Sequence, residues 1–194
     1  MTVKSLGLIA GNGKFPLLFA QKARSQHYKV IAAGIRGDTS VFLRLLVDRY
    51  ACFQVGELKK LFEFFKGSGV RQVIMAGQVN PNNLFEKDVA LDDEFRKLFD
   101  ALHDRKADTI FTAIADRLRD QGIELVDSTF LLREHLAPKG TITKRGPTLK
   151  ELNDIAFGAT IAKEMGGIDI GQTVVVKDKA IVAIEAMEDT DRAI

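Results

Sequence analysis

The first 76 residues alternate between strand-like and helix-like segments, and this alternation limits the possible fold more than any other feature. Short apolar runs, typical of buried strands, occupy residues 3–10, 28–34, 50–55 and 70–76. Between them, residues 15–26 and 58–66 carry apolar side chains at helical spacing. Strands that alternate with helices favour a parallel sheet with helices on both faces. We therefore expect an α/β protein that begins with a Rossmann-like domain.

The middle of the chain extends this first domain and then leads into a linker. Residues 84–118 are charged and have helical spacing, and residues 123–126 resemble a further strand. The polar segment 133–147 is rich in proline and glycine, which is typical of a domain boundary. We place the Rossmann-like domain at 1–135 and a smaller α/β domain at 136–194.

The last part of the chain predicts a helix followed by a hairpin. Thr148 and Glu151 have the spacing of a capping box, so a helix is expected from 148 to about 165. Apolar runs at 173–176 and 180–186 flank a polar turn, which is a hairpin pattern. The second run leads into four carboxylates within seven residues: Glu185, Glu188, Asp189 and Asp191. Such oxygen ligands suit Mg²⁺ beside a phosphate, although a solvated chain end would have the same composition.

The net charge and the cysteine content limit the binding partners and the cellular compartment expected for this chain. The formal net charge of +2 is too small to indicate a nucleic-acid partner. The single cysteine, Cys52, cannot form an internal disulfide, and the N-terminus lacks a secretory signal pattern. We expect a cytoplasmic protein whose membrane contact, if any, is peripheral, because no apolar run approaches the roughly 20 residues of a membrane span.

Two glycine-containing loops follow predicted strands and are candidate ligand sites. In 11–16, small residues would let backbone amides approach an anion at the start of a helix. Pro16 occupies the third glycine position of the dinucleotide-binding pattern, so a tight turn that binds nothing is an equal alternative. In 77–80, Gln78 and Asn80 could bind a base, ribose or phosphate, but the segment also has the composition of an ordinary turn.

A third polar segment, Asp127-Ser128-Thr129, follows the short strand-like run at 123–126. Its three side chains could contact a ligand at the carboxyl end of that strand. The same residue types also cap the segment that follows them. Both interpretations stay open on these residues alone.

Taken together and in this order, these segments resemble the LpxI family, the UDP-2,3-diacylglucosamine pyrophosphatases of lipid A biosynthesis. The matching stretches are 7–16, 76–80, 108–132 and 148–158, and most specifically 169–177 with 183–188 and 190–191. The family pattern continues for roughly a further 80 residues, so we expect the second domain to be truncated here. The family also has glycine where this chain has Asp189.

The resemblance implies hydrolysis of UDP-2,3-diacylglucosamine to UMP and 2,3-diacylglucosamine 1-phosphate, with Mg²⁺ as cofactor. It implies catalytic and metal-binding roles for Glu188 and Asp191. It also implies substrate contacts from Gly11, Asn12, Gly13, Phe15, Gly77, Gln78, Val79, Asn80, Asp127, Ser128, Thr129, Gln172 and Thr190. The implied partners are the acylated UDP-sugar, a second copy in a homodimer, and the surface of the inner membrane.

Two other function classes stay open. A relative of this family could bind a nucleotide or acylated sugar without catalysis. A nicotinamide-dependent oxidoreductase would need an acid at the end of the second strand to hold the ribose. Asp38 is a displaced candidate for that acid.

Overall fold

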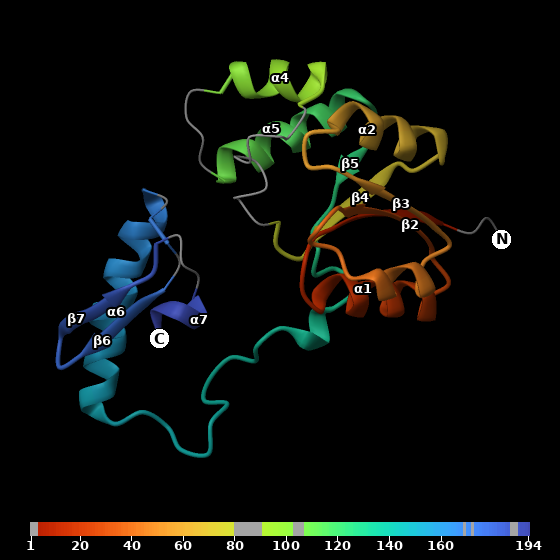
Figure 1. The fold of residues 1–194 in the computed structure, drawn as a ribbon. Coiled ribbons are helices and arrows are strands. Elements are labelled where there is room, and N and C mark those ends of the chain that lie inside the picture. The colour runs from red at the N-terminus through yellow and green to blue at the C-terminus, as the bar shows by residue number, and fades with distance from the viewer. Residues whose placement is uncertain (1–3, 80–90, 103–106, 169, 172, 187–189) are drawn as a thin grey trace. The chain divides into compact units, whose positions relative to one another are not determined.

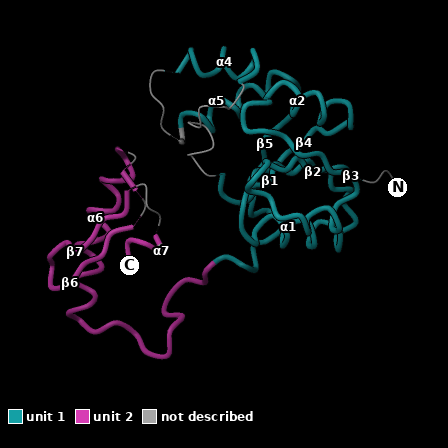
Figure 2. Tube along the Cα trace, in the orientation of Figure 1, with its two compact units in different colours: residues 1–136 teal, residues 137–194 magenta. Residues whose placement is uncertain are grey.

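The computed structural model describes residues 4–79, 91–102, 107–168, 170–171, 173–186 and 190–194, with the backbone alone at 107, 108 and 191. The chain divides into two compact units, residues 1–136 and 137–194 (Figure 2). Within the described residues, no helix combines the length and apolarity that a membrane span requires.

A five-stranded parallel sheet forms the centre of unit 1 (Figure 1). Its strands are β1 (Ser5–Ala10), β2 (Lys29–Ile35), β3 (Arg49–Phe53), β4 (Gln72–Ala76) and β5 (Glu124–Leu125). They lie in the order β3-β2-β1-β4-β5, and all neighbours are parallel. The chain builds outward from β1 to β3, then returns to the other side of β1. The predicted α/β, Rossmann-like class is confirmed.

Helices cover both faces of this sheet because side chains alternate between its faces along each strand. On β1, Leu6, Leu8 and Ala10 pack in one core cluster with Phe19 of α1 (Phe15–Ser25). Leu43 of the 3₁₀ helix η1 (Val41–Leu45) joins the same cluster. The opposite face packs against α2 (Leu58–Gly67), α4 (Asp93–Asp100) and α5 (Ala107–Asp120).

The helical stretch expected at 84–118 is described as two helices, α4 and α5. The start of α4 is fixed by Asp92, whose carboxylate accepts a hydrogen bond from the Phe95 amide at 2.8 Å. The same carboxylate accepts the Lys59 amide of α2 at 2.7 Å. One acidic side chain therefore caps the N-termini of two helices.

Unit 2 consists of α6 (Leu149–Gly167), β6 (Val174–Lys177), β7 (Ala180–Ile184) and the short α7 (Thr190–Ala193). The capping box predicted at Thr148 and Glu151 is present. The predicted hairpin is also present, as an antiparallel β6–β7 pair with a bulge at Val175/Val176. Its turn residues have positive φ, 53° at Asp178 and 58° at Lys179, as tight hairpin turns require.

Polar contacts fasten this hairpin to α6. The Asp154 carboxylate accepts the backbone amides of Asp178 at 2.9 Å and Lys179 at 2.8 Å. Lys150 forms an ion pair with the Asp178 carboxylate at 2.5 Å. Among the described residues of unit 2, Met165 is the one large apolar side chain that is buried. The hydrogen bonds of Asp154 therefore add to the packing of half-buried residues in attaching the hairpin to the helix, whereas the exposed Lys150 ion pair contributes little.

Candidate functional site

The strand order places a candidate site at the carboxyl ends of β1 and β4. Successive strands are added on one side of β1 as far as β3, and on its other side from β4 onward. The strand order therefore reverses between β1 and β4. In open parallel sheets, ligands bind in the crevice outside this reversal point. The loops that begin at Gly11 and Gly77 are the ones that leave the sheet here.

These two loops pair with each other directly after leaving the sheet. The Asn12 amide donates to the Gln78 carbonyl at 2.7 Å, and the Gln78 amide donates to the Asn12 carbonyl at 3.3 Å. The Gly11 amide donates to the Ala76 carbonyl at 2.8 Å. Two loops more than 60 residues apart in the chain are thus hydrogen-bonded to each other at the carboxyl edge of the sheet. The sequence predicted both loops but not their pairing.

Glycine is required on both sides of this pairing. A Cβ atom at Gly11 would overlap the Gln78 carbonyl, and one at Gly77 would overlap the Asn12 carbonyl. Gly77 also has a φ of +84°, which side chains rarely adopt. The close approach of the two backbones explains both glycines structurally, and it leaves the Asn12 and Gln78 side chains at the edge.

The N-terminus of α1 opens onto the same edge. Lys14 is its N-cap residue but makes no capping hydrogen bond through its side chain, and the first turn contains no acid. Pro16 occupies the first turn, where its missing N–H is not needed. Phe15 is half-buried against the core cluster beneath. Gly13 has a φ of +90°, and its amide donates to Oδ1 of Asn12 at 2.6 Å. This end of the helix keeps a positive dipole that suits an anion.

Thr39 completes the edge on the β2 side and was not anticipated from the sequence. Its hydroxyl donates to the Ala10 carbonyl and accepts the Ile35 amide at 2.7 Å. It thereby ties the ends of β1 and β2 together, one residue before Gly11. The glycine at position 37, which adopts a φ of +87° in the turn after β2, is the sequence feature that could have indicated this turn. Asp38, the acid that an oxidoreductase would need, lies in this turn beyond the end of β2.

The structure gives Asp127 a local role. Its Oδ1 accepts the Thr129 amide at 2.7 Å and the Thr129 hydroxyl at 2.8 Å. These two hydrogen bonds lower the pKa of the Asp127 carboxyl. The turn, with Ser128 at its centre, sends the chain onto the α1 face, where Phe130 packs against Phe19. These contacts stabilise a turn at residues 128–131 rather than the expected cap of a helix beginning at Phe130, because the 3₁₀ helix η2 (Arg133–His135) begins later and has Leu132 as its N-cap.

In unit 2, the structure describes few of the site residues predicted near the C-terminus. Asn80, Gln172 and Glu188 lie outside the described residues, and Asp191 is described by its backbone in α7 alone. Thr190 begins α7, and its hydroxyl lies 3.0 Å from that of Thr173. The Thr173 carbonyl in turn accepts the Glu185 amide at 3.0 Å. These contacts bring the two ends of the hairpin region together around Thr173.

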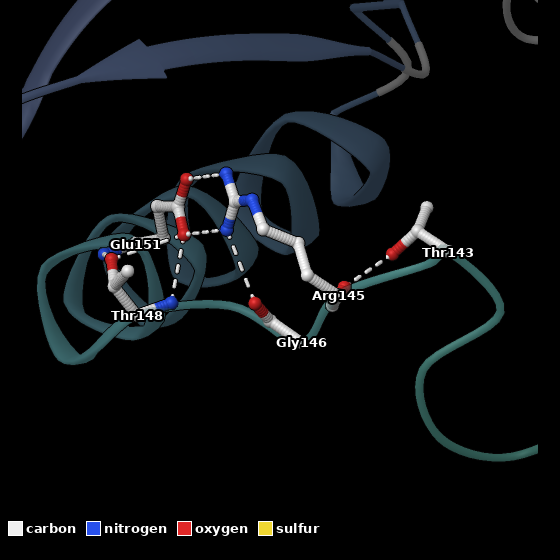
Figure 3. Close-up of polar contacts among 5 residues, drawn as sticks. All are labelled: Thr143, Arg145, Gly146, Thr148 and Glu151. Atoms are coloured by element: carbon white, nitrogen blue, oxygen red, sulfur yellow. Dashed lines mark hydrogen bonds and ion pairs between the residues drawn. The ribbon is translucent and has the colours of Figure 1, made fainter.

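An open groove of about 1190 Å³ lies within unit 2, between α6, β6 and the loop 140–147. Its α6 side combines the acids Glu151 and Asp154 with Ile155, Gly158, Ala159 and Ala162. Thr141, Thr143 and Arg145 line the loop side. Arg145 forms two hydrogen bonds with the Glu151 carboxylate, at 2.8 and 2.7 Å (Figure 3). Arg145, together with the Thr148 amide and hydroxyl, holds the pKa of Glu151 far below its usual value. This contact fixes the loop against the start of α6.

Over the described ranges, no three His, Cys, Asp or Glu side chains are grouped so that they could hold a metal ion. The expected Mg²⁺ ligands, Glu188 and the Asp191 side chain, fall outside those ranges.

Comparison with known proteins identifies the family. The LpxI N-terminal domain matches residues 5–135, and the LpxI C-terminal domain matches residues 138–194. The chain belongs to the LpxI family. It is 29% identical over 196 residues to the UDP-2,3-diacylglucosamine pyrophosphatase LpxI of Caulobacter vibrioides, covering 97% of this chain and 67% of that protein. The chain thus spans about two thirds of the length of this LpxI relative.

Solved structures add little to the family assignment. A Rhizobium etli pyruvate carboxylase variant with the activator acetyl coenzyme-A gives a TM-score of 0.40 at 11% identity, covering 100% of this chain and 15% of that one. A second pyruvate carboxylase from Rhizobium etli gives 0.38 at 12% identity, covering 89% and 14%. Neither similarity is strong enough to support an argument about the fold or function of this LpxI-family chain.

Proposed function

We propose that this protein hydrolyses UDP-2,3-diacylglucosamine in lipid A biosynthesis. The observation that carries the proposal is the match to both LpxI domains, in order, along nearly the whole chain. Water would attack one phosphorus of the pyrophosphate, and the bond from that phosphorus to the bridging oxygen would break. The products are UMP and 2,3-diacylglucosamine 1-phosphate, one of which carries the oxygen from water and the other the bridging oxygen. Membership of this family favours the pyrophosphatase over the nicotinamide-dependent oxidoreductase.

The paired loops at the β1–β4 edge are the proposed nucleotide side of the site. The side chains of Asn12 and Gln78 supply hydrogen-bonding groups for uracil or ribose, and the start of α1 supplies a positive dipole for phosphate. Val79 continues the second loop and is half-buried beside them.

We also propose a requirement for Mg²⁺, held by Glu188 and Asp191 as the sequence predicts. A bound Mg²⁺ would neutralise charge on the pyrophosphate. Removal of divalent ions with EDTA should abolish UMP release, and added Mg²⁺ should restore it. Full activity in EDTA would refute the requirement without touching the proposed reaction.

The test of the reaction is to follow UMP release from UDP-2,3-diacylglucosamine in the presence of Mg²⁺. We expect release by the unmodified protein and a loss of at least about 100-fold in Glu188→Gln and Asp191→Asn, as for removal of groups that stabilise transition-state charge. Glu164→Gln, an exposed acid on α6, is the matched control and should retain activity. Calorimetric binding of UMP without any release would instead support the non-catalytic binding protein.

A further inference from the structure

The crossover between β2 and β3 presents a cluster of large apolar side chains to solvent. Val41, Phe42 and Leu45 of η1 are 69%, 66% and 75% exposed, and we call these three residues the η1 patch. Single exposed apolar side chains are ordinary, but three within five residues are a feature that requires an explanation. The patch lies beside α1 on the α1 face of unit 1.

The η1 patch is held in this exposed position by the fold. Leu43, between the patch residues, is completely buried in the core and anchors the segment. Backbone hydrogen bonds from Leu43 to the Ser40 carbonyl at 3.1 Å and from Leu46 to the Leu43 carbonyl at 3.0 Å close the 3₁₀ turns. With Leu43 directed inward, its neighbours along the turn are directed outward.

Two arginines border the patch. Arg24 of α1 donates from Nη1 to the Leu45 carbonyl at 3.2 Å. The guanidinium of Arg44 lies 4.8 Å from the centre of the Tyr50 ring. Two acids also lie in the crossover: the Asp48 carboxylate accepts the Val30 amide at the start of β2 at 2.8 Å, and Asp38 makes interactions of its own. Apolar side chains flanked by cations complement an anionic lipid surface.

We propose that the η1 patch inserts into the surface of an anionic lipid bilayer. Three side chains fall well short of the roughly 800 Å² that each partner contributes to a standard protein interface, so a second copy or another protein is the less suitable occupant. The proposal rests on the proposed function, whose diacylated substrate resides in a bilayer. Thr39 connects the patch to the candidate site, because it lies two residues before Val41 and donates to the Ala10 carbonyl.

The test is co-sedimentation of the whole chain with substrate-free vesicles of phosphatidylethanolamine and phosphatidylglycerol. Replacing the patch by serine, as Val41→Ser, Phe42→Ser and Leu45→Ser together, should weaken binding at least about tenfold, given the transfer free energy of these side chains. Phe111→Ser, at a 43% exposed position on α5, is the matched control and should bind as the unmodified chain does.

A second arm tests the cations. Arg24→Gln with Arg44→Gln should reduce binding to vesicles with phosphatidylglycerol several-fold, whereas Arg71→Gln, at an exposed position directly before β4, should not. Vesicles of phosphatidylcholine alone should bind the unmodified chain several-fold less tightly. Absence of vesicle binding, or equal binding by the triple serine variant, would overturn the proposal. The proposal would also be overturned if the unmodified chain formed a dimer in sedimentation velocity, the triple serine variant did not, and neither bound vesicles.

These outcomes are independent of the proposed reaction. The vesicles contain no substrate, so membrane binding is measured whether or not UMP is released. With detergent-dispersed substrate, the triple variant should release UMP at the unmodified rate. With substrate in vesicles its rate should fall by about the same factor as its binding.

Discussion

Gly77→Ala tests whether the two loops at the β1–β4 edge are joined as described. The substitution introduces two costs at once, a side chain at φ +84° and an overlap with the Asn12 carbonyl. The first costs about 1–2 kcal/mol. The second forces apart the two hydrogen bonds between Asn12 and Gln78, at about 1 kcal/mol each. We expect the free energy of unfolding of unit 1 to fall by about 3–4 kcal/mol in total.

Gly69→Ala is the matched control because it isolates the first cost. Gly69 follows α2 with a φ of +68°, and an added Cβ would meet nothing within 4 Å. This variant should lose about 1–2 kcal/mol, the cost of positive φ alone. Gly11→Ala supplies the complementary case, an overlap with the Gln78 carbonyl at a position that does not have positive φ.

The assay is urea unfolding followed by tyrosine fluorescence. The chain has no tryptophan and two tyrosines, Tyr28 and Tyr50, so the signal reports on unit 1 alone. With an m value of about 2 kcal/mol per M, the midpoint should fall by about 1.5–2 M for Gly77→Ala and by about 0.5–1 M for Gly69→Ala. Equal midpoints for these two variants would show that the loops do not approach each other closely, and the proposed site geometry would be wrong.

Three further predictions concern carboxylates with defined partners. Asp92→Ala should destabilise unit 1 by about 2–3 kcal/mol in the same urea assay because two helix caps are lost, while Asp92→Asn, which keeps one acceptor oxygen, should cost about half as much. Asp154→Ala should raise the hydrogen-exchange rates of the Asp178 and Lys179 amides at least about tenfold, and unchanged rates would contradict the attachment of the hairpin to α6. The folded pKa of Glu151 is depressed, so its contribution to stability is present above its ordinary value of 4.5 and is lost as the pH falls through the folded value. The helical circular dichroism signal should therefore decrease with acid below about pH 4.5 in the unmodified chain more steeply than in Glu151→Gln, and parallel acid titrations would argue against this contact.

The order of strands and helices in unit 1 could be predicted from the sequence because apolar periodicity is a local property. The apolar runs at 3–10 and 70–76 predicted β1 and β4, and the capping-box spacing at Thr148 predicted the start of α6. The helical pattern of 84–118 did not reveal where α4 begins, because its start is capped by Asp92, whose carboxylate also caps α2.

The candidate site could be predicted from the sequence only in part, because some of its features are local and others depend on the tertiary structure. Glycine in the loops at 11 and 77 indicated close backbone approach, but no local signal states that the partner of Asn12 is Gln78. That pairing follows from the strand order, which brings β1 and β4 together across 60 residues of intervening chain. The role of Thr39 is likewise tertiary, since its acceptor Ala10 belongs to another strand. The roles of Glu188 and Asp191 stay predictions from the family resemblance.

The paired loops also bear on the entropy of ligand binding. A flexible loop that orders around a ligand loses about 1–2 kcal/mol of conformational free energy for each residue fixed. Here the residues around Asn12 and Gln78 are already fixed by one another before any nucleotide arrives. Binding at this edge should therefore show a small heat-capacity change and little entropic penalty from the protein. Changes that loosen the pairing should weaken nucleotide affinity through entropy, even when every contacting side chain is retained.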